Sequence, residues 1–446
     1  MLRQSRTIPP AETEKLVRYV GRLSRQLQTD KDLDPLIDKI GDARLVLLGE
    51  ASHGTSDYYT WRARLSRRLI EEQGFSFIAV EGDWPDCYTI NRYVKGYEDV
   101  ADSALDTLQV FERWPTWMWA NWEVAALAEW LRRHNDDQVE GRKAGFYGLD
   151  VYSLWESMEE VMGYLGERAP DSLDAARRAY LCFEPYGEDV QAYARATAIV
   201  PEDCQDEVVE LLRQVRQRVD EFPGDPHSDF NAEQNAFVLA EAEHYYRAMV
   251  AGGGNSWNVR DYHMADTLDR LLAHHEETWH GIPRAIIWEH NTHIGDARYT
   301  DMARAGMINV GQLARERYGE EGAVLVGFAS YQGSVIAGSQ WGAPMARMNV
   351  PGAQAGSWEF VLHQAMGSDR LLLMDDVRDE EAAHQWRGHR AIGVVYHPDY
   401  ESGNYVPTVL PQRYDALLFI DNSQALHPLR IEPARDEPPG LYPWGL

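Results

Sequence analysis

Short apolar segments recur along the chain, and longer segments with helical periodicity separate most of them. Each apolar segment has the length and the β-branched or aromatic content of a buried parallel strand. These segments are residues 45–48, 75–80, 144–149, 284–288, 323–328, 370–374, 391–396 and 416–420. Alternation of strands and helices is typical of a parallel sheet covered on both faces. We therefore predict an α/β fold, with a mainly parallel central sheet flanked by helices on both faces.

A long helical region interrupts this alternation. Between about residue 151 and residue 277 no convincing strand occurs, and long segments carry helical periodicity instead. The predicted organisation is an N-terminal helix within residues 1–30, a single α/β domain over 31–430 with a helical insertion at about 151–277, and an extended C-terminal arm over 431–446, which holds four prolines.

Composition and charge narrow the choice of partners. The chain has 446 residues, enough for a large core, and its 44% hydrophobic and 26% charged residues are typical of a folded globular protein. With 71 acidic and 43 basic residues, the formal net charge is −28. Such a surface repels phosphate backbones and anionic membranes. We therefore expect an enzyme with a small-molecule substrate, and neither nucleic acid nor membrane as a partner.

The cysteines and the N-terminal segment bear on location. The odd number of cysteines cannot pair completely and resembles no zinc or disulfide framework; they are Cys87, Cys182 and Cys204. Reduced thiols are the prediction, as in a cytoplasmic protein. Residues 1–28 lack the continuous apolar core of a signal peptide, and no later stretch reaches the ~20 apolar residues of a membrane span. A cytoplasmic location is predicted.

Four polar clusters each follow a predicted strand. They are residues 50–55, residues 81–84, Asp150 and residues 289–293. In parallel sheets, the loops that follow adjacent strands meet at one edge, where ligands bind. Residues that are far apart in the sequence are therefore expected to share one crevice. The glycines at 49, 54 and 82 fit tight turns where the backbone leaves a strand.

His53 is the best candidate for a general base, because a neutral imidazole can take a proton from water near neutral pH. Glu50 and Glu81 are its natural partners. A carboxylate there can hold the tautomer of the imidazole, stabilise the charged imidazole, or act as the base itself if burial raises its pKa. The sequence does not rank these roles.

His290 and His293 lie three residues apart, on one side of a helical turn or together in a loop. One of them can donate a hydrogen bond to an oxyanion while the other pairs with a carboxylate. Together with His53, Glu50, Glu81 and Asp150 they also offer a ligand set for zinc or manganese. Their spacing matches no recognised zinc motif, so we predict a site without a metal or other cofactor.

Further side chains are candidates for substrate binding. Arg62 lies on the helix that leaves the His53 loop, which is residues 50–55, and its guanidinium can fold back to hold a substrate oxygen. Residues 114–122 contain four tryptophans, more than a core helix needs, which predicts a pocket for a bulky, partly apolar ligand. The predicted substrate-binding residues are Arg62, Asp83, Trp84, Arg260, Trp117 and Trp119. Surface or core positions explain Arg62, Arg260 and several of the indoles as well.

Protein nucleophiles have little support in this sequence. There is no Gly-x-Ser-x-Gly elbow, and Cys87 follows no cysteine-hydrolase signature. No Walker loop or Gly-x-Gly-x-x-Gly fingerprint occurs, so nucleotide chemistry is not indicated. Water is the simplest nucleophile.

Taken in order, these motifs resemble the erythromycin-esterase family. The segments that carry the resemblance are Gly49–Thr55, Glu81–Trp84, Arg260–Asp261 with Met264–Ala265, and Trp288–His293, and the likeness runs from about residue 30 to about residue 430. The resemblance implies an α/β core with added helices and hydrolysis of a lactone ester without a metal. It also implies that His53 activates water among Glu50, Glu81, Arg62, His290 and His293.

The resemblance does not fix the substrate, because the family also includes succinoglycan-biosynthesis-like proteins. The tryptophan-rich segment looks more like that broad branch than like the antibiotic-resistance esterases. The leading hypothesis is a metal-independent hydrolase of an ester or lactone, with macrolide resistance or secondary metabolism as contexts. The alternatives are a metal-dependent hydrolase that uses the same residues and a homologue that binds a small molecule without catalysis.

Overall fold

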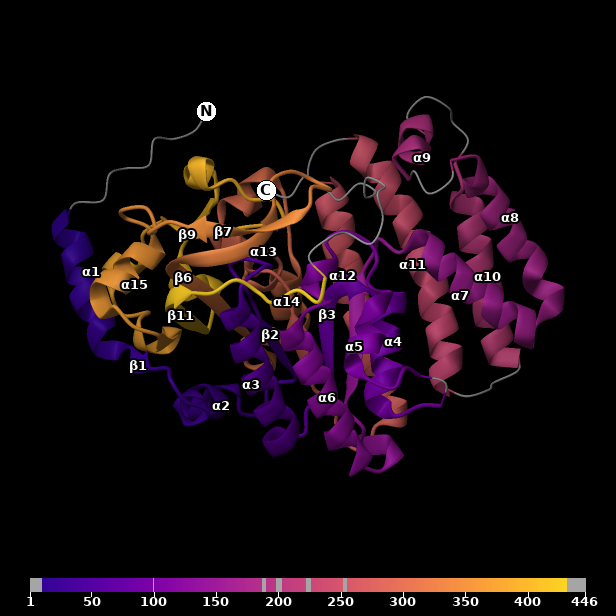
Figure 1. Ribbon diagram of the computed structural model, residues 1–446, viewed down its shortest axis with the longest axis horizontal. Helices are drawn as coiled ribbons and strands as arrows, with labels where there is room; N and C mark the ends of the chain where they lie inside the picture. Colours follow the sequence, from indigo (N-terminus) through magenta and orange to yellow (C-terminus); the bar gives the residue numbers. More distant parts are fainter. Residues whose placement is uncertain are drawn as a thin grey trace.

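The computed structural model describes residues 10–98, 100–186, 190–197, 203–221, 226–251 and 255–430. Its centre is a nine-stranded sheet with the order β1-β8-β11-β6-β2-β5-β3-β4, to which β7 adds by pairing with β6 (Figure 1). The pairings from β11 to β4 are all parallel, whereas β1, β7 and β8 pair in the antiparallel direction. The predicted, mainly parallel sheet is confirmed.

The strands of this sheet are β1 (Arg25–Gln26), β2 (Leu45–Leu48), β3 (Phe77–Asp83), β4 (Gly145–Asp150), β5 (Ala285–Trp288), β6 (Ala323–Gly338), β7 (Met345–Val350), β8 (Arg370–Leu373) and β11 (Ala416–Ser423). A separate two-stranded sheet pairs β9 (Arg387–Arg390) with β10 (Tyr405–Thr408). The helices are α1 (Pro10–Leu23), α2 (Asp34–Ile40), α3 (Ser56–Gln73), α4 (Trp84–Lys95), α5 (Ala104–Thr107), α6 (Trp122–Asp136), α7 (Leu154–Arg168), α8 (Leu173–Phe183), α9 (Val190–Thr197), α10 (Gln205–Glu221), α11 (Pro226–Ala251), α12 (Asn255–Thr278), α13 (Asn291–Ile294), α14 (Val310–Gly322), α15 (Trp358–Met366) and α16 (Leu410–Arg413).

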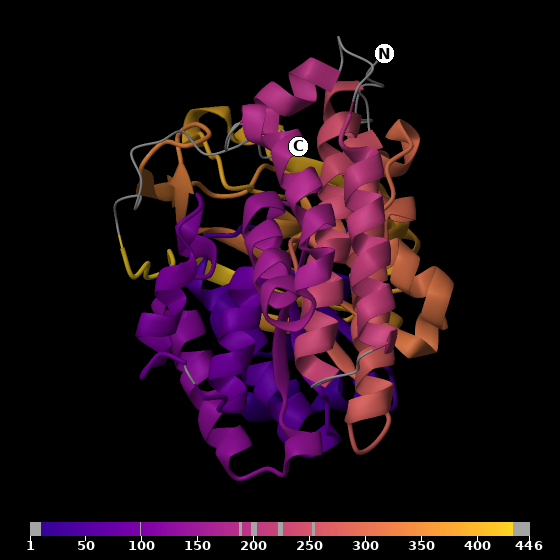
Figure 2. The ribbon, with the colours of Figure 1, turned by 90° about the vertical axis from the view of Figure 1, so that its right-hand side faces the viewer.

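Helices cover both faces of the sheet, as predicted (Figure 2). Successive side chains of a strand point to opposite faces. On β5, Ile286 and Trp288 belong to a core that includes residues of α3 and α6. Ala285 and Ile287 belong to a second core, which includes residues of α12 and α14. Because the central strands are buried on both faces, they are apolar throughout, and this is why their positions could be predicted from the sequence.

Seven of the eight predicted strands coincide with β2, β3, β4, β5, β6, β8 and β11. The prediction of a strand at residues 391–396 is wrong. This segment follows β9 and meets its neighbours only at isolated positions, where Ile392 bridges to Ser52 and Val395 bridges to Gly338. It is apolar because it is packed between the His53 loop and the end of β6, and not because it belongs to a ladder.

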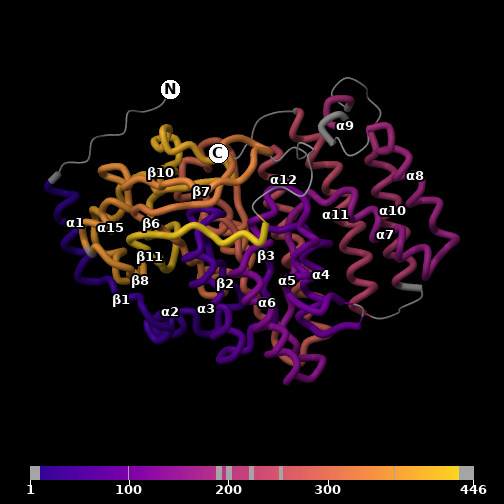
Figure 3. The backbone as a smooth tube through the Cα atoms, viewed as in Figure 1, coloured from indigo at the N-terminus to yellow at the C-terminus, as the bar shows by residue number. Residues whose placement is uncertain are grey.

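The predicted helical insertion consists of helices α7 to α12. It has a hydrophobic core of its own, to which α7, α8, α10 and α11 all contribute, and it contains no strand among its described residues. The chain enters the insertion after β4, at one edge of the sheet, and returns through α12 to β5 (Figure 3). Helix α12 therefore runs from the insertion onto the sheet and belongs to both.

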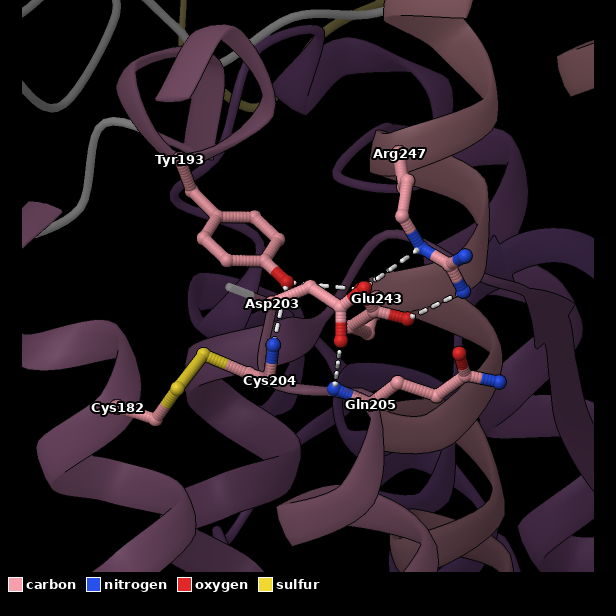
Figure 4. Close-up of a disulfide and its surroundings, with 7 residues drawn as sticks. All are labelled: Cys182, Tyr193, Asp203, Cys204, Gln205, Glu243 and Arg247. Carbon is pink, nitrogen blue, oxygen red and sulfur yellow. Dashed lines mark hydrogen bonds and ion pairs between the residues drawn. A yellow bond between two sulfur atoms is a disulfide. The ribbon is translucent and has the colours of Figure 1, made fainter. Parts of the chain in front are cut away.

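A disulfide joins Cys182 of α8 to Cys204, just before α10 (Figure 4). Tyr193 of α9 accepts a hydrogen bond from the Cys204 backbone N–H at 2.9 Å and donates one to Glu243 of α11 at 2.8 Å. The prediction of three reduced thiols is therefore wrong for two of them, whereas Cys87 is free and buried. Folding of the insertion brings the two cysteines together, which their number cannot reveal. The cysteines thus give no support for a cytoplasmic location.

Both ends of the chain are only partly described. Helix α1 lies within the segment 1–30, for which a helix is predicted, and residues 1–9 lie outside the described part. Residues 431–446, the predicted C-terminal arm, also lie outside it. None of the described helices has the length and apolar character needed to cross a membrane.

The glycines near the site are required by lack of space. None of Gly49, Gly54 and Gly82 has a positive φ, the usual reason for glycine in a tight turn. A β-carbon on Gly54 would lie 1.9 Å from the backbone oxygen of Ile336, whose N–H donates to the Gly54 oxygen. The His53 loop is therefore pressed directly against β6.

Replacing Gly54 with alanine should lower the free energy of unfolding by about 1–3 kcal/mol or more, because the new methyl group displaces backbone and not a flexible side chain. Urea denaturation measures the change. Gly163→Ala in α7 is the matched control, because its added methyl group meets no atom within 4 Å. That control should be neutral or more stable by about 0.5–1 kcal/mol. Equal stability of Gly54→Ala and the unmodified protein would contradict the close contact.

Candidate active site

The loops after four adjacent parallel strands meet at the carboxyl edge of the sheet, as the sequence predicts. These strands stand in the order β2-β5-β3-β4. Glu50 and His53 follow β2, Glu81 lies near the end of β3, Asp150 ends β4, and His290 follows β5. All five side chains are buried. The edge therefore gathers imidazoles and carboxylates in a region with little access to water.

A bulge in β3 sets the position of Glu81. Val80 pairs with Gly148 of β4, but the next pair is Asp83 with Asp150, so β3 holds one additional residue between the two pairs. Bulges bend a strand and redirect its side chains, and they are frequent beside active sites. Here the bulge lets Glu81 accept hydrogen bonds from Arg260 at 2.8 Å and from the backbone N–H of His290 at 2.8 Å.

His53 is held by a line of buried charges. Its Nδ1 lies 2.8 Å from Glu50 Oε1, and Glu50 Oε2 accepts a hydrogen bond from Arg62 at 2.7 Å. Arg62 is completely buried, and its guanidinium lies 4.3 Å from the ring centre of Tyr59 and 4.7 Å from that of Trp288. Glu50 thus fixes Nδ1 as the protonated nitrogen, which leaves Nε2 of His53 with the lone pair. No described residue forms a hydrogen bond with that Nε2.

The same charges set the pKa of His53. Burial alone lowers the pKa of an imidazole, because it disfavours the charged form. The carboxylates of Glu81 and Glu50 outweigh burial, and the pKa of His53 is raised above its ordinary value of 6.5. His53 is therefore neutral above this raised pKa and charged below it.

Arg260 of α12 joins three residues of the crevice. It donates hydrogen bonds to Asp150 at 2.6 and 2.9 Å, to Glu81 at 2.8 Å and to His293 Nε2 at 2.9 Å. Burial raises the pKa of Glu81, but His293, Arg260 and His53 together hold that pKa far below its ordinary range. Glu81 therefore keeps its negative charge although it is shielded from water.

His293 is fully occupied by its neighbours. Its Nδ1 lies 2.9 Å from Asp261 Oδ1, which also accepts a hydrogen bond from the backbone N–H of Val310. The ring of Trp257 stacks on the imidazole with 4.4 Å between ring centres. Since Arg260 donates to Nε2, both ring nitrogens have partners. His293 is thus the imidazole of the pair that contacts carboxylates.

His290 is the imidazole that keeps a nitrogen unpartnered. Its Nδ1 accepts a hydrogen bond from the backbone N–H of Thr292 at 3.3 Å and lies 2.8 Å from the Thr292 hydroxyl. Burial and nearby His53 hold the pKa of His290 well below the ordinary value, so the ring is neutral with its proton on Nε2. That Nε2–H is buried without a partner among the described residues, and the ring centre lies 4.9 Å from that of His53.

Of the four candidate substrate-binding residues that are not arginines, two line a cavity beside the crevice and two do not. Asp83 and Trp119 line a cavity of about 30 Å³ beside Glu81. This volume admits water, and it is much smaller than the ~300 Å³ or more that is usual for a drug-sized ligand. Trp84 points away from the crevice, stacking on Tyr147 and donating to Asn231, and Trp117 is completely buried.

The two arginines also differ from the prediction of direct substrate contact. Arg62 lies behind Glu50, and Arg260 lies among Glu81, Asp150 and His293. Both guanidinium groups are buried because each neutralises carboxylates that would otherwise be buried unpaired. Their charges neutralise the protein's own carboxylates, and neither guanidinium is exposed to solvent.

The sequence analysis assigns no role to two buried groups at this edge, Glu289 and Tyr59, although Glu289 belongs to the predicted cluster 289–293. Both carboxyl oxygens of Glu289 lack a hydrogen-bond partner among the described residues, and burial, with Glu81 and Asp261 nearby, raises the pKa of Glu289 well above its ordinary value. The hydroxyl of Tyr59 is likewise buried and unpartnered within the described part of the chain. The signal for Glu289 was its place directly after a strand. Nothing distinguishes Tyr59 from a core aromatic residue in the sequence.

The geometry of the crevice is relevant to the alternative hypothesis of a metal-dependent hydrolase. Within the described ranges, no three His, Cys, Asp or Glu side chains are grouped so that they could hold a metal ion. The guanidinium of Arg260 lies between Glu81, Asp150 and His293 and donates a hydrogen bond to each of them. These residues therefore already have a positive partner that belongs to the chain.

Comparison with known sequences finds a family. The sequence model of the erythromycin esterases matches residues 70–423. Erythromycin esterase type II of Escherichia coli is 24% identical over 324 residues, which cover 69% of this chain and 73% of that protein.

Solved structures share the fold over nearly the whole chain. A succinoglycan biosynthesis protein has a TM-score of 0.76 at 21% identity, covering 94% of this chain and 100% of that one. A protein from Bacillus cereus has a TM-score of 0.74 at 17% identity, covering 94% and 99%. A mutant of the erythromycin esterase EreC in its open conformation has a TM-score of 0.66 at 17% identity, covering 91% and 97%.

The electrostatics of the crevice predict how His53 titrates. The pKa of its imidazole, followed by NMR of histidine-labelled protein, should lie above 6.5. Glu50→Gln should move this pKa downward, since the variant removes a carboxylate that opposes the effect of burial. The matched control is Glu243→Gln, a buried glutamate of the insertion, which should leave the His53 titration unchanged. A pKa that stays the same in Glu50→Gln would contradict the assigned partner.

Proposed function

Because this chain belongs to the erythromycin esterase family, we propose that it is a hydrolase that cleaves a carboxylic ester or lactone by attack of water, with His53 as the general base. The observation that carries the proposal is the buried line Arg62–Glu50–His53, in which Glu50 holds Nδ1 of His53 while Nε2 of His53 has no hydrogen-bond partner among the described residues. A nucleophile that is activated by a base, with the base held by a third group, is the recurring arrangement of hydrolytic sites.

In the first step, His53 Nε2 takes a proton from water while the water oxygen attacks the carbonyl carbon. The imidazolium that forms is stabilised by Glu50, to which it donates through Nδ1 at 2.8 Å. Arg62 holds Glu50 in place and cannot be displaced by solvent, because it is completely buried. The base is thus oriented before the substrate arrives, and no reorganisation is needed during the reaction.

In the second step, the tetrahedral oxyanion accepts a hydrogen bond from the Nε2–H of His290, a neutral donor that is otherwise unpartnered in the described structure. As the carbon–oxygen bond breaks, the leaving alkoxide takes the proton from the His53 imidazolium. The products are an alcohol and a carboxylic acid, which then loses its proton to solvent. The base is regenerated, and one water molecule has been consumed.

The remaining residues of the crevice hold this pair in position. Glu81 accepts the backbone N–H of His290 and adds negative charge beside His53. Arg260 fixes Glu81, and His293 fixes Arg260 from the other side. Asp83 and Trp119, which line the cavity beside Glu81, are the proposed contacts of the substrate. A bulky, partly apolar substrate requires the side chains that line this cavity to move.

The substrate is proposed as a small-molecule ester or lactone. The E. coli relative is named for an erythromycin esterase and the structural neighbour for succinoglycan biosynthesis, so an acylated sugar and a macrolide both belong in a substrate panel. The net charge of −28 favours neutral or cationic molecules and argues against nucleic acid as a partner.

His53→Ala should reduce turnover of any ester or lactone that the protein hydrolyses by about 10²–10⁴-fold, the usual contribution of a general base. Initial rates measured across an ester and lactone panel test this. His363→Ala is the matched control, because His363 also pairs with a carboxylate through Nδ1, at 2.7 Å from Asp421, but lies outside the crevice. Undiminished hydrolysis by His53→Ala would remove His53 from the mechanism.

Chelation separates the proposal from a metal-dependent hydrolase. Activity should persist after exhaustive dialysis against a chelator, because Arg260 already supplies the positive charge between the carboxylates. Metal content of the purified protein, measured by mass spectrometry, gives the comparison. Loss of activity on chelation with recovery on adding zinc or manganese would favour the metal-dependent reading instead.

A further inference from the structure

Strand β2 ends at Leu48, whereas its neighbour β6 continues beyond the last paired residue, Val326, to Gly338. The two strands pair from Leu45 with Ala323 to Leu48 with Val326, and the N–H of Gly49 still donates to the Val326 oxygen at 2.8 Å. In a parallel ladder, alternate residues face the same neighbour, so Phe328 is the next residue of β6 whose backbone faces β2. Beyond Gly49, however, the chain turns away to form the His53 loop. The N–H and C=O of Phe328 would be buried without a partner if nothing replaced β2.

The side chain of Asn291 occupies the position beside Phe328 that a continued β2 would occupy. Its Nδ2 donates to the Phe328 oxygen at 2.7 Å, and its Oδ1 accepts from the Phe328 N–H at 3.2 Å. The carboxamide thus forms both bonds that a neighbouring strand would have formed. Its orientation is fixed, because the backbone N–H requires an acceptor and the backbone oxygen requires a donor. Asn291 itself is 1% exposed, so water does not compete.

The residue that precedes the His53 loop makes room for this carboxamide. A β-carbon on Gly49 would lie 2.1 Å from Asn291 Oδ1. Any other residue at position 49 would therefore push the amide off Phe328. The backbone N–H of Asn291 also donates to the backbone oxygen of Glu50 at 2.8 Å, which connects the loops after β2 and β5 directly.

Buried groups behind Asn291 support it. His389 Nδ1 lies 2.6 Å from Glu359, and its Nε2 lies 3.4 Å from Asn291 Nδ2. Burial lowers the pKa of His389, although Glu359 opposes this, so the imidazole stays neutral and Nε2 keeps a lone pair toward the amide. The backbone oxygen of Asn291 accepts a hydrogen bond from Arg413 at 2.7 Å. Asn291 is therefore fixed through its side chain, its N–H and its C=O.

We propose that Asn291 is a positioning residue that substitutes for β2 beside β6 and thereby sets the relation between the His53 loop and the histidines of α13. Asn291 follows His290 directly and begins the helix that carries His293. Its backbone N–H donates to the backbone oxygen of Glu50, the residue whose carboxylate contacts His53. A shift of about 1 Å in such a constellation costs on the order of 10²-fold in rate. The predicted effect on catalysis rests on the proposed function, whereas the predicted effect on the positions of His53 and Glu50 does not.

The test compares Asn291→Ala with Asn135→Ala. Asn135 is also 1% exposed and forms the same pair of bonds, from Nδ2 to the Ala144 oxygen at 2.8 Å and from the Ala144 N–H to Oδ1 at 2.7 Å, at the other end of β4. Both variants should lower the melting temperature, because both leave buried backbone groups unpaired. Asn291→Ala alone should lower kcat by about 10²-fold with little change in KM, since it disturbs the alignment of reacting groups.

NMR titration of His53 gives a readout that is independent of substrate. In Asn291→Ala the pKa of His53 should fall from its raised value, because the contact with Glu50 loosens, whereas Asn135→Ala should titrate like the unmodified protein. If Asn291→Ala does not fold, Asn291→Ser, which removes the carboxamide but keeps a polar side chain at this position, replaces it with the same expected direction.

The outcomes distinguish this proposal from the proposed function. A lowered melting temperature with unchanged kcat and an unchanged His53 titration would overturn the positioning role. The same would follow if Asn135→Ala lowered kcat as much as Asn291→Ala. If the unmodified protein hydrolyses no ester, the proposed function fails, and the His53 titration alone decides whether Asn291 positions the site.

Discussion

The site depends on the burial of charge. Glu50, Glu81 and Asp150 are each no more than 3% exposed, and carboxylates so far from water are stable only when cations neutralise them. Arg62 and Arg260 meet that demand from opposite sides of the crevice, one against Glu50 and the other against Glu81 and Asp150. Because both arginines are buried as well, the carboxylates are held in fixed positions, and the pKa of His53 follows from those positions.

The architecture explains how such a set of charges is assembled. Parallel strands deliver Glu50, Glu81 and Asp150 to one edge, but they provide no cation there. Arg62 arrives on the helix that leaves the His53 loop, and Arg260 arrives on α12, which returns from the helical insertion. The insertion is therefore more than an addition at the end of the sheet, since its last helix completes the crevice. The chain that carries this arrangement belongs to the erythromycin esterase family, and a succinoglycan biosynthesis protein shares its fold.

Much of the fold and of the crevice follows from local patterns in the sequence. Strands that are buried on both faces are apolar throughout, and the polar residues that end them mark the carboxyl edge, as Glu50, Glu81 and His290 illustrate. Contacts between distant segments do not leave such a pattern. Trp84 directly follows Asp83, the last residue of β3, yet it packs against Tyr147 in the core. Residues 391–396 are apolar because they fill a gap, and the pairing of Cys182 with Cys204 depends on how the insertion folds. The roles of Arg62 and Arg260 likewise depend on partners that are far away in the sequence.

The pH dependence of kcat/KM tests the central claim most directly, because this parameter reports the ionisation of the free enzyme. If His53 is the base held by Glu50, hydrolysis should rise with pH along a single limb, whose pKa equals that of the His53 imidazole. In Glu50→Gln the limb should move to lower pH, since loss of the carboxylate destabilises the imidazolium. A limb that stays in place in Glu50→Gln, or a rate that does not vary with pH across the titration of His53, would contradict the account.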